Sequence, residues 1–177
     1  MFALKKIFRF FLFPLFLIFL VVILSASFDI KRIDGDSMNP TLRKGDRIVV
    51  LSLYNGKRFL SSRTHAKILR NDIVIFKSPQ TNQLLIKRVL ATEGDLINFI
   101  DPNTISINGE VLHISDSKKY LFEDFTKIPK HAIFLLGDNR SHSTDSRDFG
   151  FVTIDRVQGK VLFKISARIE DASSEHG

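Results

Sequence analysis

The sequence contains no cysteine, and this absence narrows the chemistry that is open to the chain. Disulfide bonds, catalysis by a thiolate and cysteine-ligated metal sites are all excluded. The five histidines, at positions 65, 113, 131, 142 and 176, lack the spacing that is typical of metal ligands. We therefore expect no metal site in this protein.

Charged residues are absent from positions 10–28, which read FFLFPLFLIFLVVILSASF. A helix needs about 20 apolar residues to cross the core of a bilayer, so this segment predicts a transmembrane anchor. Three cations precede it, and the positive-inside rule then places the N-terminus in the cytoplasm and the rest of the chain outside. A cleaved secretory signal is the alternative interpretation, because the small residues at 25–27 suit a cleavage site.

The chain carries a net charge of +7, three units of which precede the apolar segment. The remaining moderate excess favours contact with an anionic membrane surface over binding of nucleic acid. The densest basic stretch, residues 57–70, contains five Lys or Arg and no acid. Two interpretations of this stretch stay open, a contact with lipid headgroups and a solvated loop or short helix.

Short β-branched or aromatic runs between turn residues follow position 30, a pattern typical of a mainly β fold. We expect strands at 47–51, 72–77, 84–90, 96–100, 104–107, 132–136 and 160–165. The Asn108-Gly109 pair between 104–107 and 110–114 predicts a hairpin with a two-residue turn. A weak helical pattern covers 54–69. The predicted organisation is a cytoplasmic N-terminus with its anchor (1–28), an outer β-rich domain (29–170) and a flexible tail (171–177).

A lysine lies within the predicted strand LLIKRVL, residues 84–90. Side chains alternate along a strand, so Leu85, Lys87 and Val89 share one face. Burial among apolar neighbours disfavours the charged ammonium and lowers the pKa of a lysine, which makes it a base at neutral pH. The alternative is that Lys87 extends its amine into water. Arg88, on the opposite face, keeps its proton and suits a surface position or an ion pair.

Ser37 lies in the stretch DSMNPTLRKGD, where Met38, Asn39 and Pro40 favour an irregular turn that presents a hydroxyl. A serine needs a neighbouring base to act as a nucleophile, and a neutral lysine amine can replace histidine in that role. The alternative is an ordinary turn serine bonded to its own backbone. Because fifty residues separate Ser37 from Lys87, the residues alone leave open whether the two meet.

Five stretches, taken in order, resemble the conserved boxes of bacterial type I signal peptidases, also called leader peptidases. They are SMNPTL (37–42), GDRIVV (45–50), DIVIFK (72–77), IKRV (86–89) and GDNRSHSTDSR (137–147). The match covers the chain from about position 30 to 155, behind the apolar N-terminal segment. The resemblance implies a membrane-anchored serine endopeptidase with a β-rich catalytic domain whose apolar surface touches the outer leaflet.

The resemblance also implies a role for each matched residue of the site. Ser37 is expected to be the nucleophile and Lys87 the general base, and the backbone N–H of Ser37 is expected to contribute to the oxyanion hole. Ser143 is expected to hydrogen-bond the Lys87 amine. Two further sets are expected to support the site, an ion pair of Asp145 with Arg147 and a loop shaped by Asp138, Asn139 and Arg140.

The chain departs from the family pattern at positions beside the site. Gly35 stands where some members carry a hydroxyl donor to the oxyanion, so the hole is expected to depend on the backbone N–H of Ser37 and another donor. Ser141 and His142 replace the usual acidic and amide residues, and Phe149 stands where a larger aromatic is common. His142 offers an alternative base, which the presence of Lys87 disfavours.

These features predict an enzyme that removes signal peptides from secreted preproteins at the outer face of the cytoplasmic membrane. The reaction would proceed through an acyl-enzyme on Ser37 without a cofactor, and the resemblance implies that cleavage follows small residues. The expected partners are preprotein signal peptides and the lipid bilayer, with no nucleic acid and a monomeric chain. The alternatives are a specialised relative, such as a conjugal-transfer maturation peptidase, and a catalytically silent membrane module that binds signal peptides.

Overall fold

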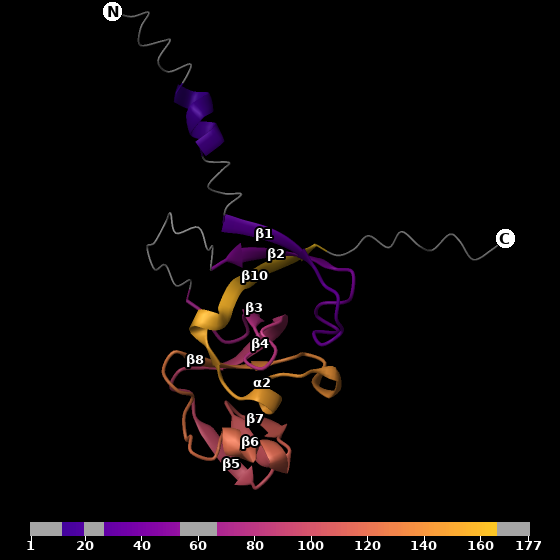
Figure 1. Cartoon of the computed structure of the whole chain (residues 1–177), viewed down its shortest axis with the longest axis vertical. Coiled ribbons are helices and arrows are strands. Elements are labelled where there is room, and N and C mark those ends of the chain that lie inside the picture. The colour runs from indigo at the N-terminus through magenta and orange to yellow at the C-terminus, as the bar shows by residue number, and fades with distance from the viewer. Residues whose placement is uncertain (1–11, 20–26, 54–66, 166–177) are drawn as a thin grey trace, which may run out of the picture.

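The computed structural model describes residues 12–19, 27–53 and 67–165. These residues form two antiparallel sheets and a few short helices (Figure 1). The larger sheet has the order β1-β2-β10-β3-β4-β8-β9, and the smaller one has the order β5-β6-β7. The strands are β1 (Phe28–Arg32), β2 (Arg47–Ser52), β3 (Ile73–Lys77), β4 (Leu84–Thr92), β5 (Ile97–Asp101), β6 (Thr104–Ile107), β7 (Glu110–His113), β8 (Ala132–Leu136), β9 (Val152–Thr153) and β10 (Val157–Ile165). A helix covers residues 12–19, and the short helices of the β-rich part are η1 (Asp116–Leu121), η2 (Arg140–His142), α2 (Ser146–Phe149) and η3 (Ile154–Arg156).

The middle of the larger sheet contains β10, the last of its strands along the chain. β10 lies between β2 and β3 and pairs with both, and its register shifts once against each neighbour. Gly159 sits opposite Ser52, where an added Cβ would lie 2.5 Å from a methyl carbon of Val50. The missing side chain therefore allows β10 to approach β2 closely.

The predicted alternation of side chains along β4 is confirmed. Lys87, Val89 and Ala91 are buried, while the residues between them are partly exposed. Val89 packs in a core with Val74 and other residues of β3 and β8. This packing is the expected result of a strand with period-2 burial in the middle of an antiparallel sheet.

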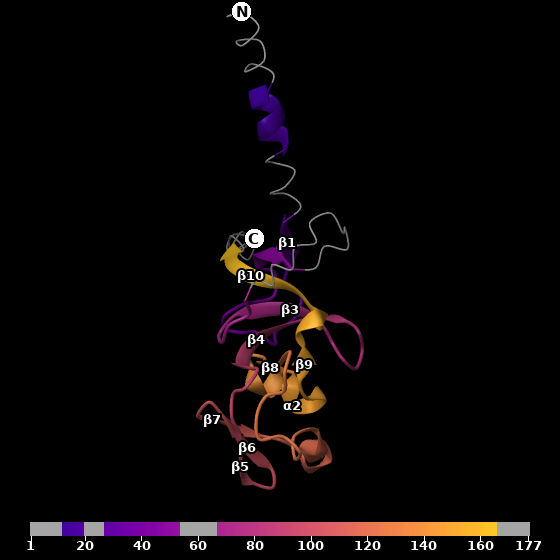
Figure 2. The same ribbon diagram turned by 90° about the vertical axis from the view of Figure 1, so that its left-hand side faces the viewer.

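The smaller sheet lies at the end of the molecule opposite β1, as both views show (Figures 1 and 2). The predicted hairpin is confirmed, since β6 pairs with β7 and both turn residues, Asn108 and Gly109, have positive φ, as a primed two-residue turn requires. Ile105, Ile107 and Phe134 share one buried cluster, so this sheet packs on β8 of the larger sheet.

The seven predicted strands are all present, and the mainly β fold is confirmed. The structure adds β1 and β9. Phe28, which the sequence analysis assigned to the apolar segment, instead begins β1 and pairs with Leu51.

Several sequence predictions fall largely outside the described residues. Of the apolar segment 10–28, the structure describes a helix at 12–19 and then residues from 27 onward. Within the described parts of the chain, no helix combines the length and apolar character needed to span a bilayer. The tail 171–177 lies outside the described residues, as do 54–66 of the weak helical pattern, whose last residues, 67–69, are not helical.

Candidate active site

The Lys87 amine contacts the Ser37 hydroxyl. The Nζ–Oγ distance is 2.7 Å, although fifty residues separate the two side chains. β4 supplies Lys87, and the turn that follows β1 supplies Ser37. Met38 and Leu42 anchor this turn, because both are buried in the core beneath it. The structure thus brings together the two residues whose meeting the sequence left open.

Lys87 is buried within the larger sheet. Its residue is 2% exposed, so the interpretation in which the amine extends into water is wrong. Burial lowers the pKa of Lys87, the nearby Asp145 carboxylate opposes this shift, and the charge of Arg147 adds to it. The amine therefore loses its proton more readily than an exposed lysine does.

The loop between β8 and α2 lies against the Ser37 turn and is hydrogen-bonded to it. Asn139 donates from its backbone N–H to the Ser37 carbonyl at 3.0 Å, and from its side chain to the Asp36 carbonyl at 3.2 Å. Gly137 lies where an added Cβ would be 2.1 Å from Ser143 Oγ and 2.6 Å from the Ser37 carbonyl oxygen. A glycine is required here because the loop and the turn are in direct backbone contact.

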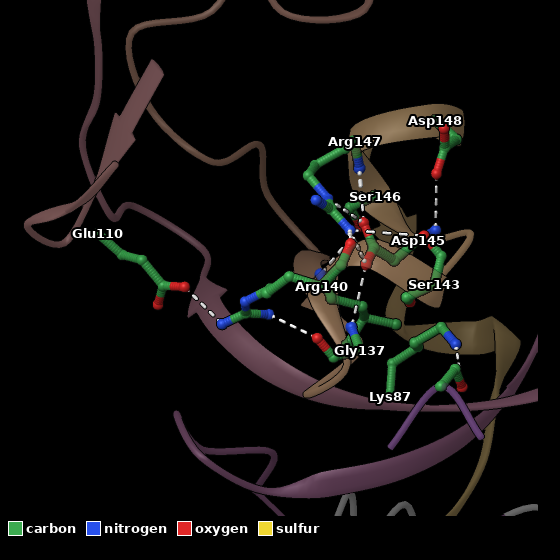
Figure 3. A network of polar contacts seen from close by, with 11 residues as sticks. Lys87, Glu110, Gly137, Arg140, Ser143, Asp145, Ser146, Arg147 and Asp148 are labelled. Atoms are coloured by element: carbon green, nitrogen blue, oxygen red, sulfur yellow. Dashed lines mark hydrogen bonds and ion pairs between the residues drawn. The ribbon is translucent and has the colours of Figure 1, made fainter. Parts of the chain in front are cut away.

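Ser143 lies beside the Lys87 amine (Figure 3) but does not bond to it. Its Oγ is buried and has no hydrogen-bond partner among the described residues. The expected hydrogen bond from Ser143 to Lys87 is therefore absent from this arrangement. The physical reason is that Lys87 directs its amine to Ser37, while Gly137 packs against the Ser143 hydroxyl.

The expected ion pair of Asp145 with Arg147 is present below this loop. Arg147 donates from Nε to Oδ1 at 2.9 Å and from Nη2 to Oδ2 at 3.0 Å. Asp145 is fully buried and also accepts the backbone N–H of Gly137 at 3.0 Å. The neighbouring Ser146 hydroxyl accepts the N–H of Leu135 at 2.9 Å. The start of α2 is therefore bonded both to the loop and to β8.

A second ion pair lies on the other face of β4. Arg88 donates to Asp138 through two hydrogen bonds, and Thr41 donates to the same carboxylate at 2.5 Å. Three segments meet here, namely β4, the turn after Ser37 and the β8–α2 loop. The sequence indicated an ion pair for Arg88 and a loop-shaping role for Asp138, but it did not indicate that they are partners.

Glu110 is a residue that the sequence analysis missed. It forms an ion pair with Arg140, and Arg140 in turn donates to the Gly137 carbonyl at 2.8 Å (Figure 3). Nothing in the hairpin sequence distinguishes this glutamate from an ordinary solvent-facing strand residue. The glutamate meets the loop only because the tertiary fold places the start of β7 next to Arg140.

The alternative base, His142, is exposed and lies within hydrogen-bond distance of Ser141, its ring Nδ1 being 2.9 Å from the hydroxyl oxygen. Among the described side chains, Lys87 is the basic group that bonds to Ser37. The same portion of the chain holds no cluster of three His, Asp or Glu residues arranged for a metal ion.

A cleft runs up to Ser37 and Lys87 between the Ser37 turn and the start of β4. An added Cβ at Gly35 in this cleft would meet nothing within 4 Å, so open space lies beside the dyad. The lining residues are Lys31, Arg32, Ile33, Asp34, Gly35, Ser37, Met38, Ile75, Leu84, Leu85, Ile86 and Lys87. The arrangement places the Ser37 hydroxyl and the Lys87 amine at the wall of an open cleft.

Comparison with known proteins agrees with this geometry. Residues 4–166 match the family described as signal peptidase, peptidase S26. Signal peptidase I of Bacillus caldolyticus is 33% identical over 148 residues, which cover 75% of this chain and 76% of that protein. Signal peptidase I V of Bacillus subtilis is 31% identical over 153 residues, covering 77% and 85%.

A chloroplast protein and a solved structure are also similar to the chain. The thylakoidal processing peptidase 1 of Arabidopsis thaliana is 33% identical over 153 residues, and the match spans 79% of this chain but 42% of that longer protein. The crystal structure of a signal peptidase I from Enterococcus faecalis is 34% identical, with a TM-score of 0.41, and the match covers 55% of this chain and 97% of that one.

Proposed function

The chain belongs to the type I signal peptidase family, peptidase family S26, and is a serine endopeptidase; we propose that it removes signal peptides from preproteins with a Ser37–Lys87 dyad. One observation carries the proposal: a lysine that is 2% exposed lies 2.7 Å from a serine hydroxyl at the end of a cleft. A buried amine next to a hydroxyl is the combination that serine catalysis needs when no histidine is available.

The proposed reaction begins with proton transfer from Ser37 to the neutral Lys87 amine. As the proton leaves, the Ser37 oxygen bonds to the scissile carbonyl carbon, and the carbonyl oxygen takes up the negative charge. Lys87 then gives the proton to the leaving amine, the C–N bond breaks, and an acyl-enzyme remains. Lys87 next takes a proton from water, whose oxygen bonds to the ester carbon. The C–O bond to Ser37 then breaks, Lys87 returns the proton to the Ser37 oxygen, and the carboxylic acid product leaves. One group thus acts as both base and acid.

The oxyanion is proposed to bind the backbone N–H of Ser37. Gly35 lacks a side chain and supplies no second hydroxyl donor from the position two before the nucleophile. A single donor of this kind is worth about 2.7–4 kcal/mol of transition-state stabilisation. We therefore expect that a second hydrogen-bond donor at this site would stabilise the oxyanion further and raise the rate of cleavage.

The proposed substrate is an extended peptide that lies in the cleft between the Ser37 turn and the start of β4. The walls next to the dyad include Leu85, Ile86 and Met38, whose apolar side chains favour small apolar side chains of the substrate over polar ones. This lining supports cleavage after small residues. Preprotein signal peptides, on which proteins named signal peptidases act, fit these requirements.

We further propose that the apolar segment before β1, residues 10–27, anchors the chain in the cytoplasmic membrane, with the N-terminus inside and the catalytic domain, which begins with β1, outside. The support comes from one face of the larger sheet, where Phe28 and Ile30 of β1 and Phe163 of β10 are 41%, 63% and 57% exposed. Ile30 and Phe163 both pair with Val49, so their side chains lie in one row. An apolar face of this kind is suited to contact with lipid. Enzyme and substrate in one bilayer would meet at raised effective concentration.

The proposal is tested with the full chain, purified in detergent, and a preprotein as substrate. We expect cleavage after a small residue, identified by N-terminal sequencing of the product. Ser37→Ala and Lys87→Met should each abolish cleavage, whereas the exposed counterparts Ser117→Ala and Lys77→Met should not. Binding of the preprotein without cleavage would favour the silent module, and cleavage by either dyad variant would exclude the proposed mechanism.

A further inference from the structure

An ion pair links the smaller sheet to the loop that covers Ser37. Glu110 is the first residue of β7, and its carboxylate bonds to Nη2 of Arg140, the first residue of η2. Figure 3 shows the glutamate reaching the loop from a separate strand. β7 belongs to the β5-β6-β7 sheet, whereas the loop follows β8 of the larger sheet. The contact is therefore tertiary and connects two parts of the fold.

Arg140 bonds to both Glu110 and the loop backbone. Its Nη1 donates to the Gly137 carbonyl at 2.8 Å. The backbone carbonyl of Arg140 accepts a hydrogen bond from Nη2 of Arg147 at 2.7 Å. The guanidinium is thus bonded on one side to the loop and on the other to Glu110. Without Glu110, Arg140 would lose the partner that directs its planar group toward Gly137.

Gly137 is the point where this chain of contacts meets the dyad. Its N–H is held by Asp145 and its carbonyl by Arg140. Its Cα faces Ser143 and the Ser37 carbonyl so closely that no Cβ would fit. A displacement of the Gly137 peptide would therefore move Ser37 or Ser143 as well.

We infer that Glu110 is a positioning residue, which acts through Arg140 and Gly137 to hold Ser37 in line with Lys87. The inference rests on the proposed dyad and adds to it a residue from the smaller sheet. Glu110 and Arg140 side chains are 37% and 40% exposed, and exposed ion pairs add only about 0–1 kcal/mol to stability. A misplacement of about 1 Å at a reacting group can nevertheless cost about a hundredfold in rate. The effect of this pair should therefore appear in catalysis and not in folding.

The expected signature is a loss in kcat with little change in KM. Glu110 lies outside the set of residues that line the cleft, so substrate binding should not depend on it. Glu110→Ala should lower kcat roughly tenfold, within the limit of about a hundredfold set by misplacement. Glu110→Gln keeps an oxygen acceptor for Arg140, so it should lower kcat less than Glu110→Ala does.

A matched control comes from another ion pair on the same sheet. Arg70 bonds to Asp95 and to Asn108 of the β6–β7 turn, and among the described residues none of its hydrogen bonds goes to the β8–α2 loop. Arg70→Gln therefore loosens the smaller sheet without touching Gly137, and its kcat should stay within about twofold of the unaltered chain. Equal losses in Arg70→Gln and Glu110→Ala would overturn the inference, because they would show general loosening of the sheet.

A double-mutant cycle gives the decisive comparison. If Glu110 acts through Arg140, then Glu110→Ala should have no further effect on kcat in an Arg140→Met background. Additive losses would overturn the inference, and so would an unchanged kcat in Glu110→Ala. Thermal unfolding of each variant shows that the chain is folded. Failure of the proposed function is seen separately, since the unaltered chain would then not cleave the preprotein at all.

Discussion

Arg88 and Asp138 form an ion pair with two parallel hydrogen bonds, Nε to Oδ1 at 2.8 Å and Nη2 to Oδ2 at 2.7 Å. Each residue directly follows a residue of the site, Lys87 in one case and Gly137 in the other. The pair therefore fixes the distance between β4 and the β8–α2 loop. Burial alone would raise the pKa of Asp138, but the hydrogen bonds from Arg88 and Thr41 outweigh it and hold that pKa below its usual value.

Replacing this carboxylate should destabilise the fold. Asp138→Ala would leave the Arg88 guanidinium and the Thr41 hydroxyl without their partner, and we expect a loss of about 2 kcal/mol in the free energy of unfolding. Urea denaturation measures this loss. The exposed pair of Lys31 with Asp29 provides the comparison, since Asp29→Ala should change stability by less than about 0.5 kcal/mol. Equal effects of the two substitutions would show that the Asp138 pair has no special structural role.

The rate of cleavage should rise with pH. The reaction needs Lys87 in its neutral form, and burial lowers the pKa of Lys87 from the usual 10.5. The value of kcat/KM should therefore increase as the pH passes through this lowered pKa and level off before 10.5 is reached. His142→Gln should leave the profile unchanged. A rise that disappears in His142→Gln would identify the histidine as the base instead.

Lys87 should also make stability depend on pH. The unfolded chain binds the proton of Lys87 more tightly than the folded protein, so stability rises with pH between the lowered pKa and 10.5. Below that window the folded protein bears the full cost of a buried ammonium. Lys87→Met removes this cost, and the variant should exceed the parent in stability most at low pH, with the difference shrinking as the pH approaches 10.5.

Urea denaturation at several pH values measures this effect, with the exposed Lys77→Met as the matched variant. Lys77→Met should show the same dependence on pH as the parent. A constant difference between Lys87→Met and the parent at all pH values would mean that the pKa of Lys87 is the same in the folded and unfolded chain.

A hydroxyl at position 35 should speed up the reaction. The backbone at Gly35 is outside the positive-φ region, and an added Cβ meets no atom within 4 Å, so Gly35→Ser fits without strain. The new hydroxyl would lie beside the Ser37 turn and can donate to the oxyanion, which should raise kcat by about threefold to a hundredfold. Gly35→Ala is the control for the added carbon and should leave kcat unchanged. An equal rise in both variants would exclude the hydroxyl as the cause.

Local patterns in the sequence predicted the parts of the structure that depend on neighbours along the chain. The Asn108-Gly109 turn predicted the β6–β7 hairpin because a primed turn needs two residues that tolerate positive φ. The alternation along β4 predicted that Lys87 shares a face with Val89, and both are buried. In each case the determining contacts lie within a few residues.

Contacts between distant segments could not be predicted in this way. Glu110 has the same local pattern as a solvent-facing strand residue, and its partner Arg140 lies thirty positions away. The position of β10 between β2 and β3 follows from the packing of the whole sheet. The contact of Ser37 with Lys87 was suggested by the family resemblance and not by any local pattern.

The insertion of β10 between β2 and β3 has a consequence for the order of events during synthesis. β2 leads back to the Ser37 turn and β3 leads on to Lys87, so the strand that joins these two halves is the one translated after both. A nascent chain that has not yet released residues 157–165 from the ribosome lacks the strand that joins the Ser37 half of the sheet to the Lys87 half. The contact of Ser37 with Lys87 is therefore expected to form only once residues 157–165 are free to pair with β2 and β3.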